Sequence, residues 1–306
     1  MSIHDWDLRH FRLLDALARS GSIGEAARTL SLAQPNASRL LESMERSARF
    51  PLVVRSPRGS RLTDRGLVLA GLASEVLAAA AQLGHAVEAL AEERGTLRVC
   101  ASLTVAEHLM PAWLATARQQ LPSLTITLDV GNSASVFGRL QEGTAELGFV
   151  EGPTVRTGHR YLDVMRDDLL LVVPPSHSWA AAQQVDAAEL LSATLVVREE
   201  GSGTRQVTDQ ALARLAPGGS LPSYLEVGSN AALVASVVAG LGPGVVSRLA
   251  VAAELSTGRL VEVRTPGLRL ARSLRAVWPA RTSLSPDGES FLRLIQTLSA
   301  PGASQP

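Results

Sequence analysis

Residues 31–43, SLAQPNASRLLES, decide the fold of the first part of the chain. Ala33-Gln34-Pro35-Asn36 is typical of a first helical turn, where Pro35 is tolerated because a first-turn residue needs no backbone N–H. An apolar face then recurs at helical spacing, formed by Ala37, Leu40, Leu41 and Met44. This face leaves four polar residues pointing outward near the start of the helix: Gln34, Asn36, Ser38 and Arg39. Amide and guanidinium groups at this end of a second helix suit base edges and phosphates in a DNA major groove.

A shorter helix precedes this one. Ser22-Ile23-Gly24-Glu25 has the pattern of a capping box, in which Ser22 and Glu25 satisfy each other's free backbone N–H groups. The helix that it opens, Ile23–Leu30, is separated from the next by Ser31-Leu32, which leaves room only for a tight turn. The pattern predicts a helix-turn-helix. On this pattern alone, an ordinary solvated pair of helices remains an alternative.

The residues that follow predict a β-wing. Leu52–Arg55 and Arg61–Thr63 have the composition of two strands joined by the turn at 56–60. Arg55, Arg58 and Arg61 lie along this hairpin, where they would contact the sugar-phosphate backbone. Residues 1–65 carry eleven Arg against seven Asp and Glu, whereas residues 66–94 carry one Arg against four Glu. The basic charge therefore lies in the segment where nucleic acid would bind.

These motifs resemble the N-terminal domain of LysR-type transcriptional regulators over about 60 residues. The matches, in order, are Gly21-Ser22, Ala26-Ala27, Leu30, Gln34-Pro35, Ser38-Arg39-Leu40, Pro51-Leu52, Arg55 and Arg61-Leu62-Thr63-Asp64-Arg65-Gly66. One position departs from the family, because Ala33 stands where Ser is usual. The substitution removes a possible N-cap or phosphate contact. The resemblance implies a winged helix-turn-helix with Gln34, Pro35, Asn36, Ser38, Arg39, Arg55, Arg58 and Arg61 at the DNA.

The composition of the whole chain limits the classes of protein to which it can belong. Its 306 residues, with 46% hydrophobic and 19% charged residues, are typical of a globular protein of two or three domains. The net charge is zero, so DNA binding must come from local patches. Cys100 is the only cysteine, which fits a reducing compartment. The start of the chain does not resemble a signal peptide, and there is no run of ~18 apolar residues. We expect a cytoplasmic protein that does not enter a membrane.

Two further helices frame the wing. Asp5–Arg19 carries an apolar helical stripe and would be the first helix of the DNA-binding domain. From about Asp64 to Glu93 runs a helix without Pro, roughly 45 Å long. Leu69, Leu72, Val76, Leu83, Val87 and Leu90 make it too apolar for a solvated helix. Packing against an identical helix is the favoured interpretation, and folding onto its own chain is the alternative. The family's matching helix forms the dimer interface, so the resemblance implies a homodimer, and pairing of dimers into a homotetramer.

After Gly95 the sequence alternates between strands and helices. Expected strands are Leu97–Ala101, Thr125–Val130, Glu146–Val150, Asp168–Val173, Thr194–Val197, Tyr224–Val227, Val245–Val246, Leu260–Val263 and Leu274–Trp278. Expected helices are Ala106–Gln120, Ser135–Glu142, Asp186–Leu191, Thr204–Leu215, Ala231–Ala239 and Pro286–Leu298. Alternation predicts parallel sheets covered by helices. The number of units favours two subdomains joined by crossing strands near Asp163–Asp168 and Gly267–Leu270.

Small polar residues follow several of these strands. They occur in 101–104, 130–133, 150–153 and 198–205, where strand ends and helix starts would meet in one cleft. At any single junction they could be ordinary helix caps. Four junctions facing one cleft favour a ligand site.

This half also resembles the family's effector domain, which has a fold like that of periplasmic binding proteins. Stretches such as LRVCASLT (97–104), ELGFVEGP (146–153) and VVREEGSGTR (196–205) carry the resemblance. It implies that Ser102, Thr104, Asn132, Glu151, Ser202, Gly203 and Thr204 line the effector cleft. A carboxylate at Glu151 would repel a simple dianion unless the carboxylate is protonated or bonded by a donor of the ligand. The charge of the effector therefore remains open.

Together these features predict a multidomain α plus α/β protein. We expect a winged helix-turn-helix at 1–65, a linker helix at 66–94 and an effector domain at 95–306. Within that domain, subdomain I would comprise about 95–163 and 270–300, and subdomain II about 164–269. The predicted function is transcription regulation on double-stranded promoter DNA, modulated by a small polar or anionic molecule, with RNA polymerase as a further possible partner. The alternative is a cytoplasmic binding protein that binds DNA only non-specifically. No catalytic motif, metal spacing or cofactor motif is recognisable, so we expect no enzyme activity, metal or cofactor.

Overall fold

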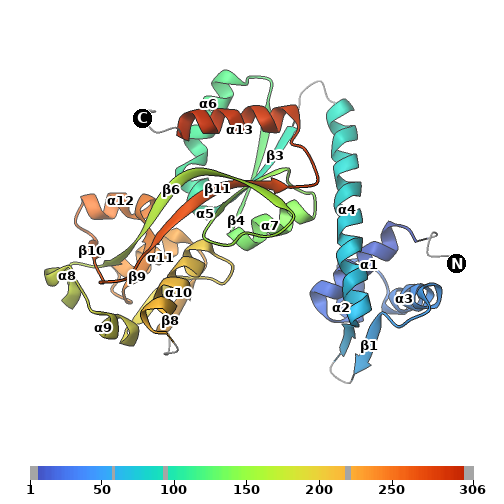
Figure 1. Cartoon of the computed structure of the whole chain (residues 1–306), viewed down its shortest axis with the longest axis horizontal. Helices are drawn as coiled ribbons and strands as arrows, with labels where there is room; N and C mark the ends of the chain where they lie inside the picture. The colour runs from blue at the N-terminus through green and yellow to red at the C-terminus, as the bar shows by residue number, and fades with distance from the viewer. Residues whose placement is uncertain (1–5, 57–58, 92–95, 218–221, 300–306) are drawn as a thin grey trace. The chain divides into compact units, whose positions relative to one another are not determined.

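The computed structural model describes residues 6–56, 59–91, 96–217 and 222–299 (Figure 1). The chain divides into two compact units, which are described separately. The first, N-terminal unit comprises residues 1–92 and 141–144, and the C-terminal unit comprises residues 93–140 and 145–306.

Three helices form the core of the N-terminal unit: α1 (Leu8–Ser20), α2 (Ile23–Thr29) and α3 (Gln34–Ala48). Asp7 and His10 form a reciprocal capping box at the start of α1, and Gly21 ends the helix in the left-handed conformation. Ser22 caps α2 by accepting from the N–H of Glu25 at 3.5 Å. The predicted reciprocal bond from the Glu25 side chain is wrong, because the N–H of Ser22 donates to the Ser20 hydroxyl instead.

The turn before α3 is as tight as its two residues require. Ser31 adopts a positive φ of 54°, and the N–H of Leu32 donates to the carbonyl of Ala27. Ala33 occupies the N-cap of α3 and makes no side-chain cap bond, while proline lies in the first turn. Ala37, Leu41 and Met44 are fully buried against α1 and α2. The apolar spacing of α3 therefore positions its polar side chains outward.

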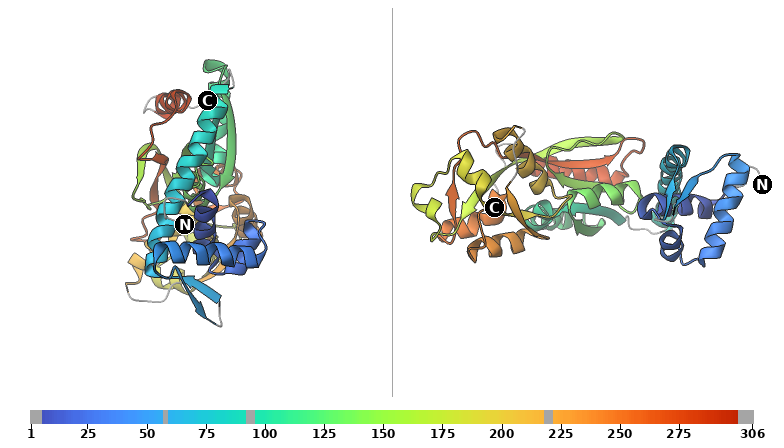
Figure 2. Two further views of the ribbon diagram at one scale, coloured as in Figure 1. Left: turned by 90° about the vertical axis from the view of Figure 1, so that its right-hand side faces the viewer. Right: turned by 90° about the horizontal axis from the view of Figure 1, so that it is seen from below.

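A hairpin of β1 (Val53–Ser56) and β2 (Gly59–Leu62) follows α3 in antiparallel register and projects from the helices (Figure 2). The Glu45 carboxylate ties it to α3 by accepting from the N–H groups of Leu52 and Val53 at 2.7 and 3.2 Å. A Cβ on Gly66 would lie 2.3 Å from the carbonyl oxygen of Leu52. Only glycine fits there, which gives the glycine of the R-L-T-x-x-G motif a packing reason.

Helix α4 (Asp64–Ala91) begins where the Thr63 hydroxyl accepts from the N–H of Gly66 at 3.0 Å. Ala70 and Ala73 pack on the core of the N-terminal unit. Much of its apolar surface remains exposed, at Leu67, Val68, Leu72, Val76, Leu83 and Val87.

The C-terminal unit consists of two lobes joined by two long strands. Lobe I has a parallel set of β3 (Thr96–Ser102), β4 (Thr125–Gly131) and β5 (Leu147–Glu151), with β3 in the middle. Its helices are α5 (Leu103–His108), α6 (Met110–Gln120), α7 (Ser133–Gln141) and α13 (Pro286–Ser299). Trp113, Phe149 and Phe291 lie in its core. A single helix at 106–120 was expected, but the helix breaks at Leu109, because Pro111 favours the first turn of a new helix.

Lobe II contains β7 (Thr194–Arg198), β8 (Ser223–Val227), β9 (Gly244–Ser247) and the short β10 (Val261–Val263). Its helices are α8 (Ser178–Ala182), α9 (Ala187–Ser192), α10 (Gly203–Leu215), α11 (Asn230–Val238) and α12 (Arg248–Ser256). Strand β7 pairs in parallel with β8 and β9. Sequence periodicity did not predict the short helices α8 and α12.

Strands β6 (His159–Val173) and β11 (Ala271–Pro279) cross between the lobes side by side (Figures 1 and 2). They pair antiparallel, with a register irregularity between Leu274 and Arg275, and join the two sets into one path of order β4-β3-β5-β11-β6-β9-β7-β8. The sheet is thus mixed and not wholly parallel. The predicted second crossing at Gly267–Leu270 is wrong. The N–H of Leu268 closes a turn onto Thr265 and Gly267 has a φ of 83°, so the strand begins only at Ala271.

Candidate functional site

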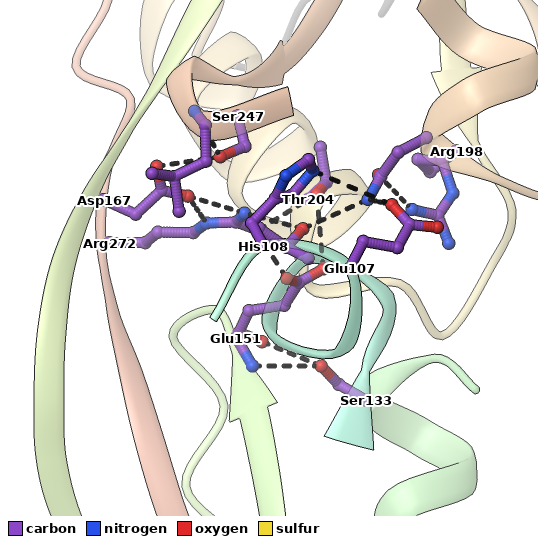
Figure 3. A network of polar contacts seen from close by, with 12 residues as sticks. Glu107, His108, Ser133, Glu151, Asp167, Arg198, Thr204, Ser247 and Arg272 are labelled. Atoms are coloured by element: carbon purple, nitrogen blue, oxygen red, sulfur yellow. Dashed lines mark hydrogen bonds and ion pairs between the residues drawn. The ribbon is translucent and has the colours of Figure 1, made fainter. Parts of the chain in front are cut away.

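Polar side chains meet in the interior of the C-terminal unit, between its lobes. Figure 3 shows them converging from helix α5, the starts of α7 and α10, the ends of β5, β7 and β9, and the crossing strands. The buried ones are Ser102, Thr104, Ser133, Glu151, Asp167, Arg198, Ser202, Thr204, Asn230, Ser247 and Arg272. Buried polar groups are costly unless they are paired, so such a concentration indicates a functional site or a polar network that holds the lobes together.

Arg272, the second residue of β11, is the centre of this cluster. Its Nε donates to Asp167 Oδ2 at 2.8 Å, and Nη2 lies 2.7 Å from the same oxygen. Nη1 donates to the Thr204 hydroxyl at 2.9 Å and Nη2 to the Thr104 hydroxyl at 3.2 Å. Asp167 is fixed further by a hydrogen bond of 2.9 Å from the Ser247 hydroxyl. One guanidinium group thus connects both lobes to both crossing strands.

Glu151, the last residue of β5, is held mainly through its backbone. Its N–H donates to the Ser133 hydroxyl, which donates to the Glu151 carbonyl at 3.0 Å. The carboxylate has weaker contacts: the Thr204 hydroxyl donates to Oε1 at 3.4 Å, and Oε2 lies 3.4 Å from Arg272 Nη2. Although that separation allows ion pairing, Oε2 accepts no hydrogen bond from the described residues.

A second polar branch surrounds Arg198. Its guanidinium group donates to both carboxylate oxygens of Glu199, at 2.8 and 2.9 Å, and to Asn230 Oδ1 at 2.6 Å. Asn230 Nδ2 donates to Glu107 Oε2 at 2.9 Å and to the Thr104 hydroxyl at 3.4 Å, so the branch joins the Arg272 cluster. Burial is the largest single influence and would raise the pKa of the Glu199 carboxyl. The hydrogen bonds and charge of Arg198, together with a backbone hydrogen bond and one from Asn132, outweigh burial and hold the pKa below its usual value.

The residues predicted from helix starts fall into two groups. Asn132 is an ordinary cap, because its Oδ1 accepts from the N–H of Ser135 at 3.0 Å, while its Nδ2 donates to Glu199 Oε1 across the lobes. Ser102 and Ser202 occupy N-caps but make no side-chain cap bond, and their buried hydroxyls have no partner among the described residues. Helix capping therefore does not explain why serine occupies these two positions.

Gly203 permits the close approach of the lobes. A Cβ at this position would lie 2.0 Å from the carbonyl oxygen and 2.6 Å from the Cγ of Glu151. The structure thus brings Thr104, Glu151 and Thr204 around Arg272, with Ser202 and Gly203 directly beside them.

Sequence reasoning missed Arg272, Asp167, Arg198 and Asn230. Arg272 and Asp167 form a pair in the register of the crossing strands, but they are 105 residues apart in sequence. The one available indication was a charged residue directly beside an apolar strand, as in Asp167-Asp168 before 169–173. Nothing local identifies the partner of such a charge.

The predicted DNA-binding residues lie on the N-terminal unit. Gln34, Pro35, Asn36 and Arg39 are exposed at the start of α3, and Ser38 is half-buried. Arg61 is exposed on β2. Arg58 and the side chain of Arg55 lie outside the described residues. The four exposed residues thus share one accessible end of α3.

Other candidate chemistry is not supported by the environments observed. Cys100 is 1% exposed, and burial raises the pKa of its thiol to about 12, which opposes a nucleophilic role. Within the described ranges, no three His, Cys, Asp or Glu side chains are placed to hold a metal ion. Likewise, none of the described helices is both long and apolar enough to span a bilayer.

Comparison with known proteins identifies the family. The model of bacterial regulatory helix-turn-helix proteins of the lysR family matches residues 8–67, and that of the LysR substrate binding domain matches residues 90–300. An uncharacterized HTH-type transcriptional regulator of Mycobacterium tuberculosis is 41% identical over 280 residues, which cover 88% of this chain and 89% of that relative.

Solved structures share the fold. The regulatory domain of Synechocystis PCC6803 CcmR in complex with 2-PG has a TM-score of 0.60 and 23% identity, and the alignment covers 67% of this chain and 97% of that one. Full-length CbnR complexed with its target DNA has a TM-score of 0.58 and 22% identity, with 96% and 100% covered.

The chain therefore belongs to the LysR family of transcriptional regulators, which confirms the resemblance seen in its motifs. It combines a winged helix-turn-helix with an effector-binding domain of the periplasmic-binding-protein type, as predicted. Its function is DNA-binding transcription regulation modulated by an effector.

Proposed function

We propose that the exposed start of α3 reads operator DNA in the major groove through Gln34, Asn36, Ser38 and Arg39, with Pro35 setting the approach of the helix. Arg39 also contacts a phosphate, as do Arg55, Arg58 and Arg61 of the wing. This proposal is supported by the exposure of the α3 residues above a fully apolar inner face. It also fits the excess of Arg in residues 1–65.

Dimerisation through α4 completes this arrangement. Leu67, Val68 and Leu83 are 54%, 65% and 68% exposed, which is an unusual amount of apolar surface for one solvated helix. A second α4 packed on this face would bury it and present two recognition helices to the halves of a pseudo-palindrome. Pairing of dimers into a tetramer and contact with RNA polymerase belong to the same proposal, which places the protein in the cytoplasm and assigns it no catalytic step.

The effector binds between the lobes of the C-terminal unit, at Ser102, Thr104, Asn132, Glu151, Ser202, Gly203 and Thr204. The observation that carries this assignment is the pair of N-cap serines, whose buried hydroxyls neither cap their helices nor form a hydrogen bond within the described residues. Because these residues come from both lobes, a ligand here favours one angle between the lobes over another. Different affinities for two lobe arrangements are what effector control of DNA binding requires.

The test uses the double variant Thr104→Ala plus Ser202→Ala in the full-length protein. DNA binding to the upstream region of the gene is measured by gel shift while small carboxylates and oxyanions are screened by thermal shift. We expect the variant to lose every ligand-induced stabilisation that the unaltered protein shows, with DNA binding retained. Loss of DNA binding with ligand stabilisation preserved would contradict the assignment of the cleft.

A further inference from the structure

Four buried polar groups between the lobes of the C-terminal unit have unused hydrogen-bonding capacity. The hydroxyls of Ser102 and Ser202 and the Oε2 atom of Glu151 have no hydrogen-bond partner in the part of the chain that the structure describes. The Thr104 hydroxyl accepts from Arg272 and Asn230, so its own proton remains available for donation. Two hydroxyls and one carboxylate oxygen are thus without a partner among the described residues, and the Thr104 hydroxyl has a partner but can still donate. Buried groups in this state are rare in folded proteins.

The two carboxylates beside Arg272 differ in how firmly they are held. Asp167 accepts from Arg272 at 2.8 Å and from Ser247 at 2.9 Å. Glu151 Oε2 approaches the guanidinium group only to 3.4 Å, and within the described stretches of the chain this oxygen accepts no hydrogen bond. Asp167 is therefore the fixed counter-ion of Arg272. The Arg272–Glu151 contact is the one that a ligand separates at least cost, because no hydrogen bond is lost.

The groups nearest this contact come from both lobes. Thr104 meets Arg272 from lobe I, and Thr204 reaches Glu151 from lobe II. Ser202 precedes Gly203, whose Cα packs directly against the Glu151 backbone. Ser102 ends the strand beside β5 in parallel register. With thirteen residues, α10 adds a helix N-terminus whose first N–H groups Ser202 leaves uncapped.

From this complementarity we propose that the effector is a compact oxyanion that carries a hydrogen-bond donor of its own, either a hydroxy acid or an oxyanion that retains a proton. The proposal rests on the effector site proposed above. The anionic oxygens accept from Arg272 and from the hydroxyls of Thr104 and Ser202. The donor of the ligand hydrogen-bonds Glu151 Oε2.

Charge explains why the donor is required. Within the inner cluster, Arg272 faces the two carboxylates of Asp167 and Glu151. An anion without a donor would place its oxygens against Glu151 in a buried site, where like charges repel strongly and no bond compensates. An anion with a donor turns the same contact into a charge-assisted hydrogen bond.

Two pairs of probes of similar shape isolate this donor. At neutral pH phosphate keeps a proton and sulfate keeps none, while lactate has a hydroxyl where isobutyrate has a methyl group. Binding of each to the full-length protein is measured by isothermal titration calorimetry. In the pair that fits the cleft, we expect the donor-bearing member to bind about tenfold to 100-fold more tightly, the range that one unsatisfied buried group produces. The two pairs distinguish an inorganic from an organic ligand.

Glu151→Gln tests the assigned acceptor, because the amide is the same shape and can donate to an anion that has no donor. In the inorganic pair, this variant should bring sulfate to the affinity of phosphate, because a sulfate oxygen can accept from the amide. In the organic pair, it should reduce the preference for lactate, because an amide oxygen is a weaker acceptor than a carboxylate. The control is Glu200→Gln, the same change on an exposed side chain of the adjacent loop, which should leave the preference intact. Ser202→Ala should weaken both members of the pair equally.

The proposal is overturned if the donor-less member binds equally well, if Glu151→Gln leaves the preference unchanged, or if no probe binds. The wider effector function would fail differently. In that case no ligand of any class in the thermal-shift screen would depend on Thr104 and Ser202.

Discussion

The exposed start of α3 and the buried cluster around Arg272 place the proposed DNA-binding residues and the proposed effector-binding residues in opposite environments. In the N-terminal unit, Gln34, Asn36 and Arg39 lie in solvent above the apolar cluster that includes Ala37, Leu41 and Met44. In the C-terminal unit, Thr104, Thr204 and Arg272 are 0%, 1% and 6% exposed. A solvated side chain can change without consequence for folding, whereas a buried charge contributes to stability and function together. Recognition and folding are therefore separable in one unit and coupled in the other.

The largest expected effect is on the C-terminal unit, where stability and function are coupled. Arg272→Ala would leave Asp167 and Glu151 buried without a cation, so we expect the free energy of unfolding of the C-terminal unit to fall by about 3–5 kcal/mol. Urea denaturation followed by tryptophan fluorescence measures it. The control Arg166→Ala, on exposed β6 surface, should change it by no more than about 0.5 kcal/mol. Equal, small effects from both variants would show that Arg272 does not stabilise the buried cluster.

A backbone contact sharpens the comparison within the N-terminal unit. Gly66→Ala forces a Cβ to within 2.3 Å of the Leu52 carbonyl oxygen, and should destabilise this unit by about 1–3 kcal/mol. Gly24→Ala is the matched control, since its Cβ would meet nothing closer than 3.6 Å and alanine favours the helix. Thermal unfolding should show opposite shifts for the two variants. Similar shifts would mean that the hairpin moves freely away from α4.

The raised pKa of the Cys100 thiol predicts that the C-terminal unit loses stability at alkaline pH. Burial raises its pKa from 9.0 to about 12 in the folded protein. The neutral form is favoured on folding, so this stabilisation is complete below pH 9 and is lost as the pH rises from about 9 to about 12, where only the unfolded thiol ionises. At pH 10 the loss should be about 1 kcal/mol. The difference in stability between the unaltered protein and Cys100→Ala should narrow over this range, and a constant difference would refute the shift.

The smallest effect on stability is expected in the N-terminal unit, where DNA recognition and folding are separable. Arg39→Ala should leave unfolding almost unchanged, within about 0.5 kcal/mol. It should nevertheless reduce the slope of log K for DNA against log salt by ~0.9 if Arg39 binds one phosphate. Arg46→Ala, an exposed position near the other end of α3, should leave that slope unaltered. An unchanged slope for Arg39→Ala would remove the phosphate contact from the proposal.

The features of the N-terminal unit were easier to predict from the sequence than those of the C-terminal unit. Helix starts, the turn at Ser31-Leu32 and the hairpin depend on residues close in sequence, so motif and spacing predicted them. The second crossing strand was misplaced by several residues, because a turn at Gly267 and pairing with distant β6 decide where β11 begins. The hydroxyl residues of the cleft could be proposed from helix starts. Whether each hydroxyl caps its helix depends on what packs above it.

By itself, the sequence determined the winged helix-turn-helix, the long α4, the two-lobed α/β unit and the hydroxyl groups at helix starts. Apolar periodicity, caps and turns all act over a few residues, so these features can be read along the chain. Only the tertiary structure placed Arg272 against Thr104, 168 residues away, and distinguished the firmly held Asp167 from the loosely held Glu151. A buried charge is stabilised by whatever partners the whole fold brings within about 3 Å, and no local pattern specifies them.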